Sequence, residues 1–331
     1  MAEKHGIRML SMEDILNDPE IELVVNLTQP KSHFDVTSKL LNAGKHVYTE
    51  KVLAVSLEEG RALVELANEK GLYLGAAPDT FLGAAVQTAR LAIENGLIGK
   101  VTSCVAQLAR DNKSYSQTIP FLAEPGGGVG FDVGIYYLTA LLSVLGPVHK
   151  VNGMLKTNSD RCVVIQPKSD RFMQEYTLVP ESVMVGTLQF DSGVIGTLHF
   201  NSECISPEEC NITVFGSEGV LYMPDPNSFG GKVYYRPKGC EEKIPVPAAF
   251  GYSENSRGIG AAEMAWSIRA GRTPRASKEM AYHALDVLHS IVKSCEEERN
   301  IPIESTFEKP QPLPRGHIKG YLDLDPEAAL V

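Results

Sequence analysis

Short apolar segments and amphipathic segments alternate along roughly the first hundred residues. The apolar segments, rich in strand-forming residues, occupy residues 21–30, 45–51 and 72–77. Apolar positions recur at helical spacing in residues 12–18, 33–43 and 57–70. Ser11 is placed to cap the first of these helices, whereas Gly44 and Gly71 are placed to end the other two. Strands that alternate with helices at this spacing predict βαβ units, and the segment 21–30 is expected to be a buried parallel strand.

The pattern changes near residue 100, where strand-like segments follow one another with turn residues between them. They occupy residues 101–110, 148–157, 183–190, 193–200, 211–217 and 219–224. The turn at Asp191, Ser192 and Gly193 is the clearest hairpin signal. Strands linked by hairpins predict an antiparallel sheet.

The remaining segments complete the predicted architecture. Residues 225–258 are rich in turn residues and are expected to form loops that fold over a cleft, whereas 261–271 and 276–298 have helical spacing. The predicted class is α/β followed by α+β, with a parallel sheet and helices in residues 1–78 and an antiparallel sheet with helices in residues 79–300. The proline-rich residues 301–331 are expected to form an extended surface tail, for which a return to the first domain is one option.

The most informative stretch is Gly126–Tyr137, which reads GGGVGFDVGIYY. A helix from Phe131 onward places Asp132 and Tyr136 on one face, because they are four residues apart. A carboxylate would then stand beside a phenol at the polar end of a buried helix. The alternative is a glycine loop before an ordinary core helix, with the acid stabilised by the helix dipole and the tyrosines packing.

Polar residues also follow two of the predicted parallel strands. Thr28, Gln29 and Pro30 end the first strand, and Glu50 and Lys51 end the second. Because ligands of parallel sheets bind at the carboxyl ends of strands, both groups are expected to face one crevice.

Composition and charge narrow the partners. The 331 residues carry a formal net charge of −10 and a sequence pI near 5.4, which disfavours binding to nucleic acid or anionic membranes. No apolar run reaches the ~20 residues that span a bilayer, and the first residues lack a signal-peptide core, so a cytoplasmic location is expected. The six cysteines and eight histidines form no CxxC or HExxH pattern, so no metal site is expected.

Several segments resemble the Gfo/Idh/MocA oxidoreductases, in the family's order and over nearly the whole chain. They are residues 28–33, 43–51, 79–101, 126–146 and 257–277. The resemblance implies a Rossmann domain, incomplete in residues 1–78, followed by a domain with an open antiparallel β-sheet and helices in residues 79–300. It also implies hydride transfer between NAD or NADP and a hydroxyl or carbonyl group of a sugar, polyol or related molecule. A homo-oligomer, dimeric or tetrameric, is expected through the antiparallel sheet.

The resemblance also implies roles for individual residues. Lys51 stands in the family's Glu-Lys-Pro motif, in which Val52 replaces the proline. Tyr136 matches the glucose–fructose oxidoreductase and dimeric dihydrodiol dehydrogenase branch, in which this phenol exchanges the proton. The hypothesis is that Tyr136 is the general acid/base, that Lys51 tunes it and binds cofactor or substrate, and that Asp132 positions the substrate hydroxyl. The alternative for Tyr136 is a packing role.

Further residues carry weaker expectations. The resemblance places Thr28, Pro30, His33, Glu50 and Lys51 beside the cofactor, although His33 could instead simply start a helix. Arg110 ends a strand leading toward the cleft and either meets substrate or is solvated, with solvation favoured. Tyr137 and His283 are expected to pack in the interior.

One family feature is missing from the sequence, which contains no GxGxxG motif. The family's first strand, phosphate loop, helix and second strand have no counterpart before residues 1–9, so weak NAD(P) binding and an unpaired apolar sheet edge are expected. Either Met1 is an internal residue of a complete dehydrogenase, or the chain is a non-catalytic binding or oligomerisation module. A third option is sugar binding without turnover. The sequence does not identify the substrate, and it does not decide between NAD and NADP.

Overall fold

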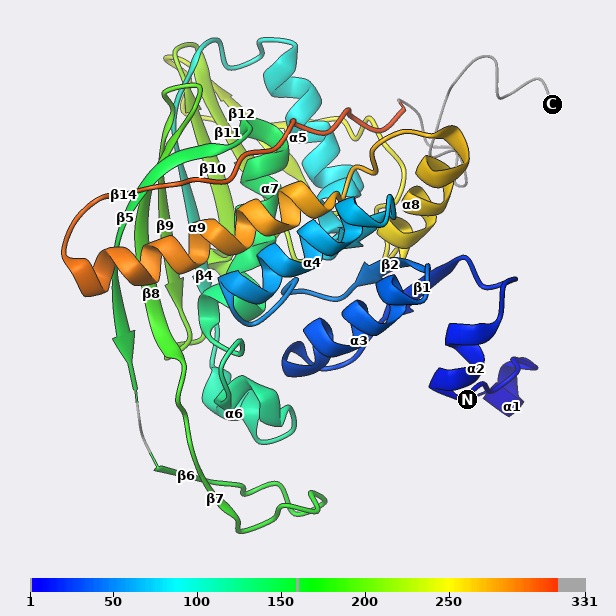
Figure 1. The fold of residues 1–331 in the computed structure, drawn as a ribbon. Coiled ribbons are helices and arrows are strands. Elements are labelled where there is room, and N and C mark those ends of the chain that lie inside the picture. Colours follow the sequence, from blue (N-terminus) through cyan, green and yellow to red (C-terminus); the bar gives the residue numbers. More distant parts are fainter. Residues whose placement is uncertain (1, 159–160, 315–331) are drawn as a thin grey trace.

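The computed structural model describes residues 2–158 and 161–314, which begin with two short helices and a small parallel sheet (Figure 1). The helices are α1 (Ala2–His5) and α2 (Met12–Asn17), and Ser11 and Asp14 form a capping box at the start of α2. The sheet has the order β1-β2-β3 and consists of β1 (Leu23–Asn26), β2 (His46–Thr49) and β3 (Leu74–Ala76). Two helices alternate with these strands, α3 (Pro30–Asn42) and α4 (Leu57–Glu69). The predicted βαβ arrangement is confirmed.

The first strand differs from the prediction in length and burial. β1 covers only four of the ten residues predicted, and α3 begins at Pro30, because proline fits the first position of a helix. Among the described strands, β1 pairs only with β2, and its Val25 is 43% exposed. The apolar edge expected for this strand is therefore present, whereas its expected burial is not.

The second sheet has nine strands in the order β13-β12-β11-β10-β4-β9-β8-β5-β14. They are β4 (Val101–Ala109), β5 (Val148–Thr157), β8 (Glu181–Phe190), β9 (Ile195–Asn201), β10 (Asn211–Gly216), β11 (Gly219–Met223), β12 (Val233–Pro237), β13 (Ile244–Val246) and β14 (Ile301–Pro302). The expected hairpin at Gly193 joins β8 to β9. The antiparallel expectation is wrong at one place, since β4 and β9 are parallel. These strands are neighbours in space but far apart in sequence, so the spacing of the turns could not reveal their direction.

Several elements were not predicted. β12 and β13 lie in the segment expected to be loop, and a separate hairpin, β6 (Arg161–Val163) with β7 (Glu175–Thr177), projects from the body (Figure 1). The short helices are α6 (Asn112–Ser116) and the 3₁₀ turns Thr80–Leu82, Pro120–Ala123 and Pro207–Glu209. A π-helical turn, Gly130–Gly134, precedes α7 (Ile135–Leu145), where a continuous α-helix was predicted.

Helices join the two sheets into one hydrophobic core. The helices α5 (Ala84–Glu94), α7 and α9 (Lys278–Glu297) pack on one face of the large sheet, and α9 also packs against α4 (Figure 1). The helix α8 (Ile259–Ala270) packs against β2 and β3. Close approach of α9 to the sheet depends on glycine, because a Cβ at Gly153 of β5 would lie 2.5 Å from Ile291. Within residues 2–158 and 161–314, none of the helices has the length and apolar character needed to cross a bilayer.

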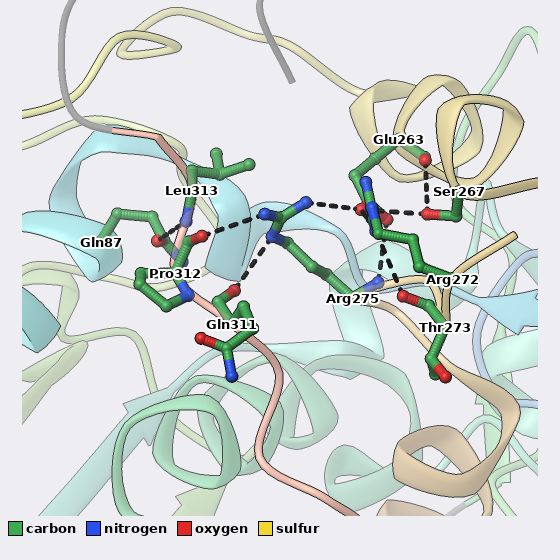
Figure 2. A network of polar contacts seen from close by, with 9 residues as sticks. All are labelled: Gln87, Glu263, Ser267, Arg272, Thr273, Arg275, Gln311, Pro312 and Leu313. Atoms are coloured by element: carbon green, nitrogen blue, oxygen red, sulfur yellow. Dashed lines mark hydrogen bonds and ion pairs between the residues drawn. The ribbon is translucent and has the colours of Figure 1, made fainter. Parts of the chain in front are cut away.

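After β14 the chain runs as an extended segment across the helices to residue 314, as predicted for the tail (Figure 1). Residues 315–331 of the predicted tail lie outside the described residues. Phe307 and Leu313 are buried, so the segment is part of the core surface rather than a loose strand. Figure 2 shows how it is held: Arg275 donates to the carbonyl oxygens of Gln311 and Pro312. The division of the chain into domains at residue 78 stays a prediction.

Candidate active site

Three predicted residues meet at the carboxyl end of β2. Lys51 follows β2, Asp132 lies in the π-helical turn, and Tyr136 lies in the first turn of α7. The Lys51 ammonium donates to Asp132 Oδ1, and its nitrogen lies 6.0 Å from the centroid of the Tyr136 ring. Asp132 and Tyr136 are only 4% and 7% exposed. The structure therefore brings the acid, the phenol and the ammonium together.

The glycines before Asp132 allow a buried carboxyl group to support the turn. A Cβ at Gly128 would lie 2.0 Å from Glu181 Oε1, so a larger residue there would have to displace this carboxyl group. The Gly130 N–H donates to the same carboxyl oxygen at 3.2 Å. Burial raises the pKa of Glu181 to about 7. The glycine-rich sequence thus serves packing against β8 at this point.

Asp132 also binds a second cation, Arg110, which corrects the expectation for that arginine. Arg110 Nη1 donates to Asp132 Oδ2 at 3.0 Å, and the Arg110 side chain is only 19% exposed. The favoured expectation of a solvated Arg110 is wrong. Each oxygen of Asp132 accepts a hydrogen bond from one cation, so this carboxylate orients Lys51 and Arg110. Its predicted contact with a substrate hydroxyl stays a prediction.

The phenol of Tyr136 is contacted by a residue that no sequence motif indicates, Arg257. Arg257 Nη1 donates to Tyr136 Oη at 3.2 Å. Burial raises the pKa of Tyr136 to about 12, and the Arg257 cation acts in the opposite direction. The Lys51 ammonium is bound to Asp132 and lies 6.0 Å from the centroid of the Tyr136 ring, so its tuning of the phenol stays a prediction. Arg257 and Tyr136 are 121 positions apart, and an arginine in a loop carries no sequence pattern that indicates this contact.

A polar cavity of about 490 Å³ opens beside Arg257, between residues 224–231 and 253–257. Asp225, Asn227 and Ser253 contribute polar side chains to its wall. The loop-rich segment predicted to fold over a cleft therefore does line one. Side chains of this kind suit a ligand with several hydroxyl groups.

The predicted cofactor residues divide into exposed and buried ones. Thr28 is exposed, and Glu50 and Lys51 are half-buried, at the ends of adjacent strands. Pro30 is buried at the start of α3. His33 is fully buried, with Nδ1 2.6 Å from the Val52 carbonyl oxygen and Nε2 3.0 Å from that of Thr28. Because both ring nitrogens are engaged, His33 joins the two strand ends and does not offer a hydrogen bond to a cofactor.

The residues present fit one end of a dinucleotide. A hydroxyl, a carboxylate and an ammonium at neighbouring strand ends suit a ribose and a nicotinamide. Among the described elements, the turns from β1 to α3 and from β2 to α4 contain no glycine, so neither is a glycine-rich phosphate loop. Also within the part of the chain that the structure describes, no group of three His, Cys, Asp or Glu side chains is placed to hold a metal ion.

Tyr137 and His283 are interior residues, as expected. Both are fully buried. Tyr137 Oη donates to Asp225 Oδ1 at 2.9 Å, and His283 Nε2 accepts from the Val148 N–H at 2.9 Å. Their polar atoms therefore bridge segments of the fold.

Comparison with known proteins agrees with this architecture. The model of an oxidoreductase family with an NAD-binding Rossmann fold matches residues 1–77, and that of the GFO/IDH/MocA C-terminal domain matches residues 86–222. An uncharacterised oxidoreductase of Schizosaccharomyces pombe is 31% identical over 146 residues, which are 44% of this chain and 40% of that protein. The chain thus matches less than half the length of such curated relatives.

A bovine (Bos taurus) trans-1,2-dihydrobenzene-1,2-diol dehydrogenase is 27% identical over 274 residues, which are 81% of this chain and 74% of that enzyme. The structure of a levoglucosan dehydrogenase in complex with NADH has the same fold, with a TM-score of 0.78 at 18% identity over 92% of this chain and 86% of that one. Two domain models of one family match consecutive parts of the chain, and the structural match extends over both. The chain belongs to the Gfo/Idh/MocA family of oxidoreductases.

Proposed function

We propose that this protein is an NAD(P)-dependent oxidoreductase that acts on a hydroxyl or carbonyl group of a sugar, polyol or similar molecule. The observation that carries the proposal is the buried phenol of Tyr136 near the ammonium of Lys51, with a hydrogen bond to the phenol from Arg257, which lines a polar cavity. The names of the relatives, a diol dehydrogenase and a levoglucosan dehydrogenase, support the same substrate class.

The chemistry assigned to the side chains follows from their charges. A bound nicotinamide would supply or accept the hydride. Tyr136 gives its proton to a carbonyl oxygen in reduction and takes a proton from a hydroxyl in oxidation. Lys51, oriented by Asp132, places positive charge near the oxygen on which negative charge develops. Because the pKa of Tyr136 is about 12, the phenol is protonated at neutral pH, so reduction should be faster there and oxidation should speed up as pH rises.

Replacement of Tyr136 by phenylalanine tests the proton transfer. Phenylalanine keeps the packing of the ring but removes the acid, so kcat should fall by about 10²–10⁴-fold. The measurement is oxidation of NADH or NADPH with a panel of aldoses, ketoses and diols. Tyr137→Phe is the matched control and should keep most of the activity, since its phenol faces Asp225. A fully active Tyr136→Phe variant would remove Tyr136 from the mechanism.

Cofactor titration separates this proposal from a second one. The absence of glycine from the turns after β1 and β2 favours weak pyrophosphate binding by the described residues, and hence a module that binds polyols without turnover. Calorimetric titration with NADH and NADPH, then with a polyol, distinguishes the two functions. An oxidoreductase should bind the nicotinamide and turn over. A binding module should bind the polyol without binding the nicotinamide cofactor and without turnover.

Self-association is a further part of the proposal. We infer a homo-oligomer through the face of the large sheet that α5, α7 and α9 leave uncovered. Exposed apolar side chains on that face, Met154 at 75% and Ile195 at 47%, support it. Light scattering should give a mass that is a multiple of 36.0 kDa, and a strictly monomeric chain would contradict the inference. The predicted cytoplasmic location belongs to the same proposal and rests on the sequence alone.

A further inference from the structure

The phenol of Tyr136 and the ammonium of Lys51 are near each other but are not hydrogen-bonded. The Lys51 nitrogen is bound to Asp132 and lies 5.7 Å from the Phe121 ring centroid and 6.0 Å from that of Tyr136. The hydrogen bond to the phenol oxygen comes instead from Arg257. We propose that Arg257, and not Lys51, is the cation that stabilises the ionised phenol of Tyr136 and so sets its acid–base strength. This proposal rests on the proposed function of Tyr136 as the general acid/base.

The Arg257 guanidinium is held in a fork between two partners. One terminal nitrogen donates to Tyr136 Oη at 3.2 Å, and the other donates to Asn227 at 2.8 Å to Oδ1 and 3.3 Å to the carbonyl oxygen. The planar guanidinium holds its N–H groups in fixed directions, so it can donate to Tyr136 and to Asn227 at once, whereas the N–H groups of an ammonium rotate. The contact to the phenol is therefore oriented.

The backbone that carries Arg257 is fixed from the interior. Asp79 Oδ2 accepts from the Gly258 N–H at 2.9 Å and from the Gly260 N–H at 3.1 Å, just before and within α8. A Cβ at Gly260 would lie 2.1 Å from Tyr48 Oη, so the start of the helix packs tightly on β2. Although Arg257 is exposed to the cavity, its position depends on buried groups.

The charged groups around the phenol explain why Arg257 is needed to favour its ionised form. Burial opposes ionisation of Tyr136, and the carboxylates of Glu50 and Asp132 oppose it further. The Asp132 carboxylate is shared between Lys51 and Arg110, and the Lys51 ammonium is directed at this carboxylate rather than at the phenol oxygen. Of the groups that face the phenol, Arg257 favours the ionised form both by charge and by its hydrogen bond.

A titratable probe at position 136 tests the proposal without any turnover. In the full chain, Tyr136 is replaced by 3-nitrotyrosine, whose phenol titrates near neutral pH and absorbs visible light. In the Arg257→Gln background its pKa should rise by about one to two units, the size expected for loss of a charged hydrogen bond. Arg257→Lys should restore part of the shift. Arg269→Gln, which removes an exposed arginine from α8, should leave the titration unchanged.

The possible outcomes separate the two proposals. An unchanged titration in Arg257→Gln, or a rise in Lys51→Met that exceeds it, would overturn the role of Arg257 and leave the oxidoreductase proposal intact. A shifted titration in a chain whose Tyr136→Phe variant is fully active would keep the effect of Arg257 on the phenol but remove Tyr136 as the general acid/base. If Arg257→Gln does not fold, Asn227→Ala keeps the cation but loosens the fork, and a smaller rise is expected. In a folded, active Arg257→Gln enzyme, the pH dependence of alcohol oxidation should move to higher pH.

Discussion

Asp132 is one buried carboxylate between two largely buried cations. Lys51 and Arg110 are 13% and 19% exposed at their side chains, and Asp132 is 6% exposed at its own. The group has one net positive charge. Removal of either cation leaves a neutral pair, whereas removal of the carboxylate leaves two like charges close together in a poorly hydrated place.

The three single substitutions should therefore differ in their effect on stability. Asp132→Asn should lower the free energy of unfolding by about 3–5 kcal/mol, the usual cost of leaving buried charge uncompensated. Lys51→Met and Arg110→Met should each cost clearly less. Urea denaturation at neutral pH measures all three. Equal effects of the three changes would show that the charge balance around Asp132 does not govern stability.

At the scale of residues, the sequence predicted neighbours within a motif better than neighbours across the fold. Lys51, Asp132 and Tyr136 could be grouped because each sits in a motif of known place in the family. Arg257 could not, because a loop arginine has no periodic pattern and its partner is 121 positions away. The burial of Arg110 was missed since a strand-ending arginine is usually solvated, and only the position of Asp132 makes burial tolerable.

At the scale of elements, Glu181 of β8 connects the large sheet to the turn that carries Asp132. Its carboxyl group accepts the Gly130 N–H and fills the space left by Gly128. Its pKa in the folded chain, about 7, lies above the ordinary value of 4.5 because burial disfavours the charged form. Between pH 4.5 and 7, the Glu181 carboxyl group is ionised in the unfolded chain but still protonated in the folded chain. The free energy of unfolding therefore falls as pH rises from 4.5 through 7.

Glu181→Gln should remove this loss, because glutamine keeps an acceptor for Gly130 but never ionises. Above pH 7 the variant should be more stable than the parent by up to about 3 kcal/mol, and the difference should vanish below pH 4.5. Denaturation curves across this range give the measurement, with the exposed Glu242→Gln as control. A variant that is less stable than the parent at high pH would mean that the ionised carboxylate is needed there.

Elements were predictable where local rules act. Ser11 caps α2, Gly44 and Gly71 follow α3 and α4 at positive φ, and Gly193 turns the β8–β9 hairpin. Predictions failed where the structure depends on contacts between residues that are distant in sequence. β4 pairs in parallel with β9, which is far from it in sequence, and the π-helical turn at Gly130–Gly134 is contacted by Glu181, 51 positions after Gly130.

At the scale of the whole molecule, a buried network joins α8, the turn after it and the extended C-terminal segment. Glu263, fully buried in α8, accepts from Arg272 Nη1 and Arg275 Nη1 at 2.7 Å and from the Arg275 N–H at 2.9 Å (Figure 2). Arg275 in turn holds carbonyl oxygens of residues 311–312, and the Leu313 N–H donates to Gln87 of α5. The sequence predicted the extended segment, but its path over the helices depends on this network.

Glu263→Gln tests whether the network stabilises the whole molecule. The amide cannot balance two arginines, so the free energy of unfolding should fall by about 3–5 kcal/mol, as for other broken buried ion pairs. The control is Glu297→Gln, which removes an ion pair between Glu297 and Arg299, whose side chains are 38% and 56% exposed respectively. It should lower the free energy of unfolding by no more than about 1 kcal/mol. Because Arg275 would lose its anchor, amide exchange at Leu313 should also accelerate in Glu263→Gln and not in the control. If both variants unfold at the same denaturant concentration, the C-terminal segment is held by burial of Phe307 and Leu313 and not by the ion pairs.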